Sequence, residues 1–139
     1  MIKVKTIYPL MLEAFEEGKS FTFPVKGTSM IPLLHTNDTV TIVPKEDYSI
    51  GDIVLFKRSE DVFVLHRIIN KYEAMFDIVG DHQTKIERAV KLENIVGAVI
   101  SYTKKGEEKI NNLNTKRYKF YKFIVKFKLF RFLFSKLKW

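Results

Sequence analysis

Short runs of alternating apolar and polar residues, separated by turn-forming residues, dominate this chain, and helical spacing stands out only near its N-terminus. Tyr8, Leu12 and Phe15 recur at intervals of three and four, with Glu residues between them. This spacing predicts an amphipathic helix over about residues 6–18, with one apolar stripe against a core. Pro9 is expected in the first turn of that helix, where its missing N–H costs little.

From residue 21 onward the spacing changes to the period of two that is typical of strands. Gly, Pro, Asn and Asp residues punctuate these runs, and the segment from Ser59 to Asp61 is expected to be a hairpin loop. Many short strands with turns between them favour a mainly all-β fold, either a barrel or a folded sheet. The strands are expected at residues 21–26, 39–43, 53–57, 62–70, 75–79 and 95–102.

The composition indicates one packed domain. The chain has 139 residues, of which 46% are hydrophobic, and this is enough for a core of its own. It contains no cysteine, which excludes disulfide bonds, thiolate zinc sites and cysteine catalysis. Of its 24 Lys and Arg residues, nine lie in the acid-free segment from Lys116 to Trp139, so the other 15 nearly balance the 16 acidic residues. A near-neutral body with a basic tail is unlike a uniformly basic nucleic-acid binder, and no specific nucleic acid is expected as a partner.

This uneven charge divides the chain into four parts. We expect an N-terminal helical segment at 1–20, a β domain at 21–103, a polar linker at 104–115 and a basic, aromatic tail at 116–139. The tail is expected to form a basic amphipathic helix.

The tail is expected to lie in an anionic membrane surface, with its aromatic rings sunk and its basic groups in water. A spanning helix is not expected, because a Lys or Arg at its centre costs ~2.5–3.5 kcal/mol. Packing of the tail on the β domain or on a partner is the alternative. Since no secretory signal pattern is evident, we expect a peripheral protein on the cytoplasmic side of the membrane, or alternatively a soluble cytoplasmic one. The expected membrane contacts are Lys119, Lys122, Lys126, Arg131 and Trp139.

Two residues could supply the chemistry of a serine hydrolase. Ser29 follows Gly27 in a turn that contains Pro32, and such a turn can expose the hydroxyl and aim the Ser29 N–H at a developing oxyanion. His66 lies on a largely apolar strand face, where burial favours the neutral imidazole that a general base requires. The plain alternatives are an ordinary turn serine and a core histidine bonded to a carbonyl. Asp81 could orient His66, or it could cap local N–H groups in a turn.

No metal or other cofactor is expected. His35 and His82 do not lie at metal-ligand spacing with acidic residues, and we interpret both as surface residues. Asp52, directly after Gly51, is interpreted as a turn residue that directs the next strand.

Five short motifs follow one another in order between Phe21 and Tyr102. Together they resemble the type I signal peptidase and LexA-like serine protease superfamily. Because position 66 holds a histidine rather than a lysine, the chain resembles the Ser-His branch of this superfamily, which is found in archaea and the endoplasmic reticulum. The motifs are Gly-Thr-Ser-Met-Ile-Pro at 27–32, Ser-Ile-Gly-Asp-Ile-Val-Leu-Phe at 49–56, Val-Leu-His-Arg-Ile-Ile at 64–69, Val-Gly-Asp at 79–81 and Ile-Val-Gly-Ala-Val at 95–99.

The resemblance implies roles for individual residues. Ser29 would be the nucleophile and His66 the general base, and Asp81 would support the histidine. Gly27 stands where the family often has a serine that donates to the oxyanion, so the Ser29 N–H together with Thr28 is expected to fill this role.

Two further departures concern the third catalytic position. His82 replaces the usual Asn after Gly-Asp, and the acidic residue further on is Glu87 rather than Asp. Asp81 is therefore the exact match to the family pattern at this position.

The resemblance also implies a substrate that lies extended between the strands at 21–26 and 62–68, with small side chains in shallow pockets. The residues expected to line those pockets are Phe23, Val25, Met30 and Val64.

Three functions follow as hypotheses. The first is a membrane-associated serine endopeptidase that cleaves a peptide or leader sequence through a Ser29 acyl-enzyme. The second is a LexA-like protease that cleaves itself, although only 28 residues precede Ser29 and no Ala-Gly or Cys-Gly bond lies among them. The third is a non-catalytic module that keeps the fold and binds a membrane or a partner.

Overall fold

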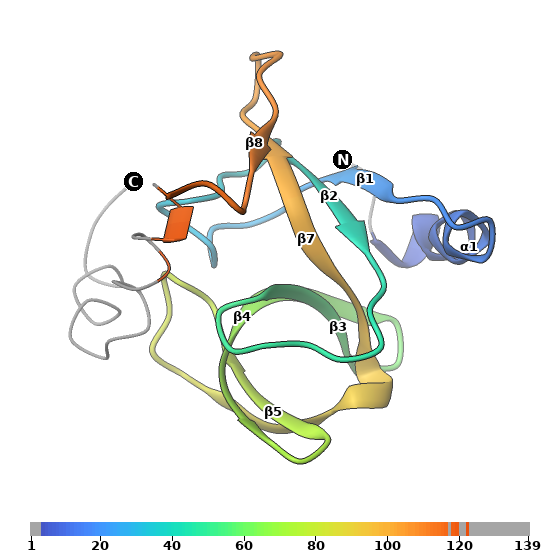
Figure 1. Cartoon of the computed structure of the whole chain (residues 1–139), viewed down its shortest axis with the longest axis vertical. Coiled ribbons are helices and arrows are strands. Elements are labelled where there is room, and N and C mark those ends of the chain that lie inside the picture. Colours follow the sequence, from blue (N-terminus) through green and yellow to red (C-terminus); the bar gives the residue numbers. More distant parts are fainter. Residues whose placement is uncertain (1–3, 117, 120–121, 123–139) are drawn as a thin grey trace.

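The structure, a computed structural model, describes residues 4–116, 118–119 and 122 (Figure 1). It confirms the expected fold class, which is mainly β with one short N-terminal helix. Most of the expected C-terminal helix lies outside the described residues. The elements are α1 (Val4–Glu16), β1 (Phe21–Pro24), β2 (Thr39–Val43), β3 (Ile53–Ser59), β4 (Val62–Tyr72), β5 (Met75–Val79), β6 (Glu87–Lys91), the 3₁₀ turn η1 (Leu92–Asn94), β7 (Ile95–Thr103) and β8 (Asn111–Asn112).

Helix α1 packs on the core through an apolar stripe that includes two of the three expected residues, Tyr8 and Phe15. The helix begins and ends two residues earlier than predicted, so Pro9 lies in its interior, on the exposed side. The prediction for Leu12 is wrong, because its side chain is 40% exposed and Met11 is buried instead. The stripe at helical spacing consists of Val4, Ile7, Tyr8, Met11 and Phe15.

The described strands form one antiparallel sheet in the order β1-β2-β7-β3-β4-β5-β6, with β8 paired to β7. Strand β7 joins the two halves, because Ala98 is paired with Val43 of β2 and with Val54 of β3. At the neighbouring Gly97, a Cβ atom would lie 2.9 Å from the Val43 carbonyl oxygen. The missing side chain therefore permits the close approach of strands at this crossing.

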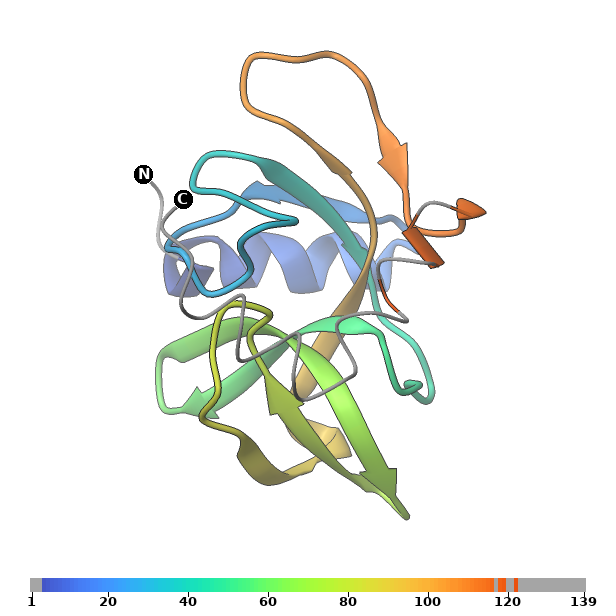
Figure 2. The ribbon, with the colours of Figure 1, turned by 90° about the vertical axis from the view of Figure 1, so that its left-hand side faces the viewer.

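The sheet folds over so that it encloses two cores (Figure 2). One core lies between α1, β1 and β2 and includes Met11, Phe23 and Met30. The other lies among β3, β4 and β5 and includes Phe56 and Phe76. The first half of β4 and the chain that follows β1 line one pocket, and Ser29 and His66 are among its lining residues.

Several boundaries differ from the prediction. The expected hairpin between β3 and β4 is present, but its loop is one residue shorter than expected, because Ser59 belongs to β3. Strand β6 was not expected, because Glu87–Lys91 is rich in charge and lacks a clear apolar alternation; it forms at the sheet edge by pairing with β5. The segment 104–115, expected to be a linker, contains β8, which is paired with Ser101 and Tyr102 of β7.

Candidate active site

The loop that carries Ser29 is fixed at its start. Gly27 has a φ of +91°, a conformation that favours glycine. Thr36 holds it from both sides, because its hydroxyl accepts from the Gly27 N–H at 3.1 Å and donates to the Gly27 carbonyl at 3.0 Å. The Thr28 carbonyl accepts from the Ile31 N–H at 3.2 Å, which closes a turn around Ser29. The nucleophile candidate therefore lies on an ordered turn.

The end of the same loop is bonded to the turn that follows β7. Asp38 is buried and accepts from the His35 N–H, the Lys105 N–H and the Lys104 ammonium group. Lys104 and the donated N–H groups lower the pKa of Asp38, although burial opposes them. His35 is therefore half-buried beside Lys104, and its interpretation as a surface residue is corrected.

His66 lies on β4 opposite Val54 and is only 3% exposed. Burial lowers its pKa to about 4; Glu87 acts in the opposite direction, and Arg58 adds to the lowering. The imidazole is therefore neutral at physiological pH, as the sequence predicts. A neutral ring is the state in which a histidine can accept a proton from a hydroxyl.

The Ser29 carbonyl and the His66 imidazole both lie beside Gly80. A Cβ atom on Gly80 would lie 2.5 Å from the Ser29 carbonyl oxygen and 3.1 Å from His66 Nε2. The Ser29 carbonyl also accepts from the His82 N–H at 2.9 Å, so the loop after β5 is bonded directly to the serine. Nε2 of the histidine therefore faces the Ser29 side of the site.

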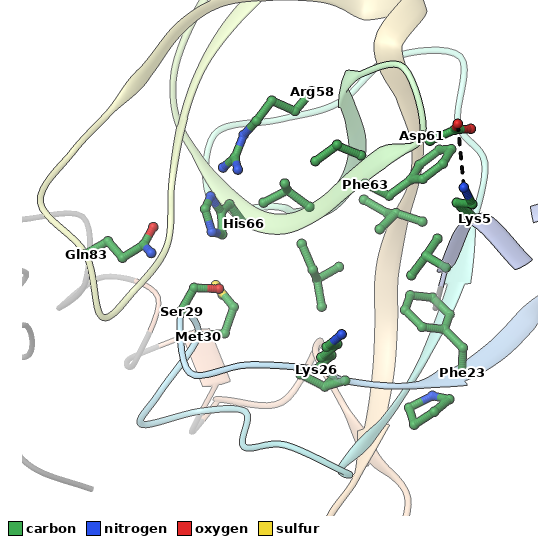
Figure 3. A pocket seen from close by; sticks show the side chains of 17 residues that line it. Lys5, Phe23, Lys26, Ser29, Met30, Arg58, Asp61, Phe63, His66 and Gln83 are labelled. Atoms are coloured by element: carbon green, nitrogen blue, oxygen red, sulfur yellow. Dashed lines mark ion pairs between the residues drawn. The ribbon is translucent and has the colours of Figure 1, made fainter. Parts of the chain in front are cut away.

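Ser29 and His66 line one pocket of about 410 Å³, which they enter from opposite walls (Figure 3). The walls come from α1, the chain from Phe23 to Met30, and the first half of β4. All four expected substrate-binding residues, Phe23, Val25, Met30 and Val64, line it. Thr28, the expected second donor to the oxyanion, does not line the pocket.

The expected contact between Asp81 and His66 is not made. Both carboxylate oxygens of Asp81, which is fully buried, accept from Arg67 at 2.8 Å. Nδ1 of His66 has no hydrogen-bond partner among the described residues. Asp81 therefore fixes its loop through the buried guanidinium group, and its predicted role as the residue that orients the histidine is corrected.

Glu87 is the acidic residue that faces the histidine. Its Oε1 lies 3.9 Å from His66 Nδ1, and its carboxylate is also paired with Arg58. Glu87 stands where the family pattern has a later Asp, but its side chain is one methylene longer, so the exact match Asp81 was expected in this role instead. The signal in the sequence that pointed to Glu87 was its position, six residues after Asp81. Its strand, β6, was not predicted from the periodicity.

The remaining histidine, His82, is half-buried beside this site rather than on the surface. Its Nδ1 is buried and has no partner among the described residues. No group of three or more His, Cys, Asp or Glu residues in the described part of the chain is arranged to hold a metal ion.

The lowered pKa of His66 predicts a pH dependence of stability. The unfolded imidazole has a pKa of about 6.5 and the folded one about 4. Between these values the unfolded state binds more protons, so the free energy of unfolding rises with pH and is reduced below pH 4. A shift of this size corresponds to about 3 kcal/mol. Chemical denaturation of the wild type and of His66→Gln from pH 4 to 7 measures this contribution as the difference between their slopes of unfolding free energy against pH. Parallel plots for the two proteins would contradict the prediction.

A family model described as Peptidase S24-like matches residues 3–100, which include Ser29, His66, Asp81 and Glu87. No curated protein sequence matches the chain significantly. The family match agrees with the resemblance to LexA-like and signal-peptidase-like serine proteases, whose S24 members are generally serine peptidases and include some non-catalytic proteins. Because the model covers well over half of the chain, the protein belongs to the Peptidase S24-like family.

Proposed function

We propose that the protein is a serine endopeptidase that cleaves a peptide or leader sequence through an acyl-enzyme on Ser29. One observation carries the proposal: the Ser29 carbonyl and His66 Nε2 both lie against Gly80, at an apolar pocket of about 410 Å³. A half-buried serine on an ordered turn supplies the hydroxyl, and a buried histidine on β4 supplies a base that is neutral at physiological pH.

In the proposed reaction, His66 Nε2 removes the proton from Ser29 Oγ as the oxygen attacks the scissile carbonyl. The Ser29 N–H donates to the oxyanion, and Thr28, which was expected to assist it, does not line the pocket. The imidazolium then protonates the departing amine, and the carbonyl remains as an ester on Ser29. A water molecule, deprotonated by His66, hydrolyses this ester and restores both residues.

The walls of the pocket suit an extended peptide. Val25 directs its N–H and C=O toward Asp38 and Asn37, so the Pro24 carbonyl and the N–H and C=O of Lys26 point to the other side of the strand. The first half of β4 is paired with β3, whereas its pairing with β5 begins only at Arg67. A substrate strand placed between these two edges would put alternate side chains among the apolar pocket residues.

The proposal is tested with a fluorophosphonate probe and a peptide library. We expect the wild-type protein to be labelled on Ser29, as located by peptide mass spectrometry, and to cleave library peptides after small apolar residues. Spectra of the protein incubated alone separate this activity from self-cleavage. A wild-type protein that is folded and is labelled on no serine at any pH from 5 to 9 would contradict the proposal and favour a non-catalytic module.

The two acidic residues near His66 are expected to affect different properties. We infer that Glu87 orients His66 once substrate excludes water, because such contacts tighten only in the substrate complex. Glu87→Gln is expected to lower kcat/KM roughly 10- to 100-fold. Since Glu87 raises the pKa of His66, the acid limb of the pH profile should also move to lower pH.

Asp81→Asn provides the contrast. Removing one partner of the buried Arg67–Asp81 pair is expected to cost about 3–5 kcal/mol of stability. Urea denaturation measures this loss, while Glu87→Gln should leave the midpoint nearly unchanged. A shift of the acid limb of the pH profile in Asp81→Asn but not in Glu87→Gln would reverse the assignment.

We further propose that the tail attaches the protein to an anionic membrane surface on the cytoplasmic side. No helix in the described part of the chain is long and apolar enough to cross a membrane. Of the expected contacts, Lys119 is exposed and the carbon chain of Lys122 packs over Gly51. Lys126, Arg131 and Trp139 lie outside the described residues. The support for this proposal is the concentration of nine cations in an acid-free segment.

Vesicle sedimentation tests this attachment. Each cation near an anionic surface contributes ~1 kcal/mol, so Lys119→Gln with Lys126→Gln should weaken binding to phosphatidylglycerol-containing vesicles roughly 30-fold. Lys85→Gln with Lys109→Gln, which removes two cations from the body, serves as the matched control. Equal binding by the two double variants, or binding to neutral vesicles alone, would contradict the proposal.

A further inference from the structure

The side chain next to the proposed general base is a buried cation that gathers three separate segments. Arg67 is 1% exposed. Its Nε and Nη2 donate to Asp81, and its Nη1 donates to the Gly51 carbonyl at 2.8 Å and to the Tyr118 hydroxyl at 2.7 Å. The guanidinium group therefore links the turn before β3, the loop after β5 and the C-terminal segment.

The loop after β5 transmits this arrangement to the active site. Asp81 lies between Gly80, which faces the Ser29 carbonyl and His66 Nε2, and His82, which donates to the Ser29 carbonyl. A change in where the guanidinium holds Asp81 therefore moves two groups that contact the reacting pair. Both members of the Arg67–Asp81 pair are next to site residues in the sequence: Arg67 directly follows His66, and Asp81 directly follows Gly80.

Tyr118, which contacts Arg67, lies on a helical turn that is capped by Thr115. The Thr115 hydroxyl accepts from the Tyr118 N–H at 3.2 Å, and the Thr115 carbonyl accepts from the Lys119 N–H at 3.0 Å. This is the geometry of a helix N-cap. Lys122 lies four residues after Tyr118, on the same helical face, and its side chain packs over Gly51.

We propose that Tyr118 is a positioning residue for the Ser29–His66 site, acting through Arg67 and Asp81. This inference rests on the proposed peptidase function. Tyr118 lies outside the region matched by the family model, so the C-terminal segment completes a network whose other members lie within it. Tyr118 is itself buried, and the loss of its hydroxyl would remove an acceptor from a guanidinium N–H that water does not reach.

Tyr118→Phe isolates this hydrogen bond. The ring, whose centre lies 5.6 Å from the Arg67 guanidinium carbon, is retained. The matched control is Tyr72→Phe, which removes a tyrosine hydroxyl bonded to Asp77 at 2.8 Å at the far end of β4. Both variants are compared at a temperature where circular dichroism shows them fully folded.

Two readouts are used. The first is the rate of fluorophosphonate labelling of Ser29, which we expect to fall about tenfold or more for Tyr118→Phe and to stay within twofold of wild type for Tyr72→Phe. The second is the NMR titration of the His66 imidazole, whose pKa also depends on the charges of Glu87, Arg58 and Asp81. A loosened loop admits water, so the midpoint should rise from about 4 toward the ordinary value.

A double-mutant cycle tests the route of the coupling. If Tyr118 acts through the Arg67–Asp81 pair, Tyr118→Phe should have little further effect on labelling in an Asp81→Asn background. Additive effects would mean a separate route and would overturn the proposal. If Asp81→Asn does not fold, the comparison of Tyr118→Phe with Tyr72→Phe still tests the proposal.

Labelling and His66 titration that are unchanged in Tyr118→Phe, or that change equally in Tyr72→Phe, also overturn the inference. Failure of the proposed function is distinguishable from this outcome. In that case even the wild type is not labelled on Ser29, while the His66 titration still reports whether Tyr118 positions the histidine.

Discussion

Ser29→Ala is expected to abolish fluorophosphonate labelling and to lower peptide cleavage by about 10³-fold or more. The size follows from the chemistry, because a site without its nucleophile retains only substrate binding and oxyanion stabilisation. His66→Ala should cause a similar loss of cleavage, since it removes the proposed general base. The two losses should not add, because the residues act as one unit.

The matched control is Ser59→Ala, at an exposed serine in the hairpin between β3 and β4. Cleavage of a library peptide is followed by mass spectrometry, and folding is checked by circular dichroism. Cleavage by Ser29→Ala at more than a tenth of the wild-type rate would show that another group is the nucleophile. Full activity of His66→Ala would likewise remove the buried imidazole from the mechanism.

Gly80→Ala is expected to reduce kcat/KM about 100-fold or more, although it adds only one methyl group. That methyl would lie 2.5 Å from the Ser29 carbonyl oxygen and 3.1 Å from His66 Nε2. The first of these atoms is backbone and cannot turn aside, so the loop after β5 must move away from the serine. A displacement of about 1 Å at a catalytic group can cost roughly 100-fold in rate.

Gly106→Ala is the control for the chemical change itself. Gly106 has a φ of +79°, and no atom lies within 4 Å of the added Cβ. Its substitution should cost about 1–2 kcal/mol of stability through backbone strain and leave kcat/KM per folded molecule unchanged. If Gly80→Ala behaves in the same way, with a loss of stability alone, then the contact at Gly80 does not determine the position of the reacting groups.

The amino-acid sequence was most informative where local pattern and local structure coincide. The period of two located six of the eight strands in the described residues, and the apolar setting of His66 correctly indicated a lowered pKa. The short charged strand β6 escaped because pairing with β5, rather than its own side chains, holds it in the sheet. Leu12 was wrongly assigned to the buried stripe of α1, because it has the right spacing but faces solvent.

The order of motifs along the chain determined the family, the mainly β fold and the candidate pair Ser29 and His66, because these depend on residue types at fixed separations. The partners of charged side chains were decided only in three dimensions. Asp81 lies next to Gly80 in sequence, yet the buried guanidinium of Arg67 captures both its oxygens and leaves Glu87 to face the histidine. A buried cation must be paired, and the sequence does not show which carboxylate the folded chain brings to it.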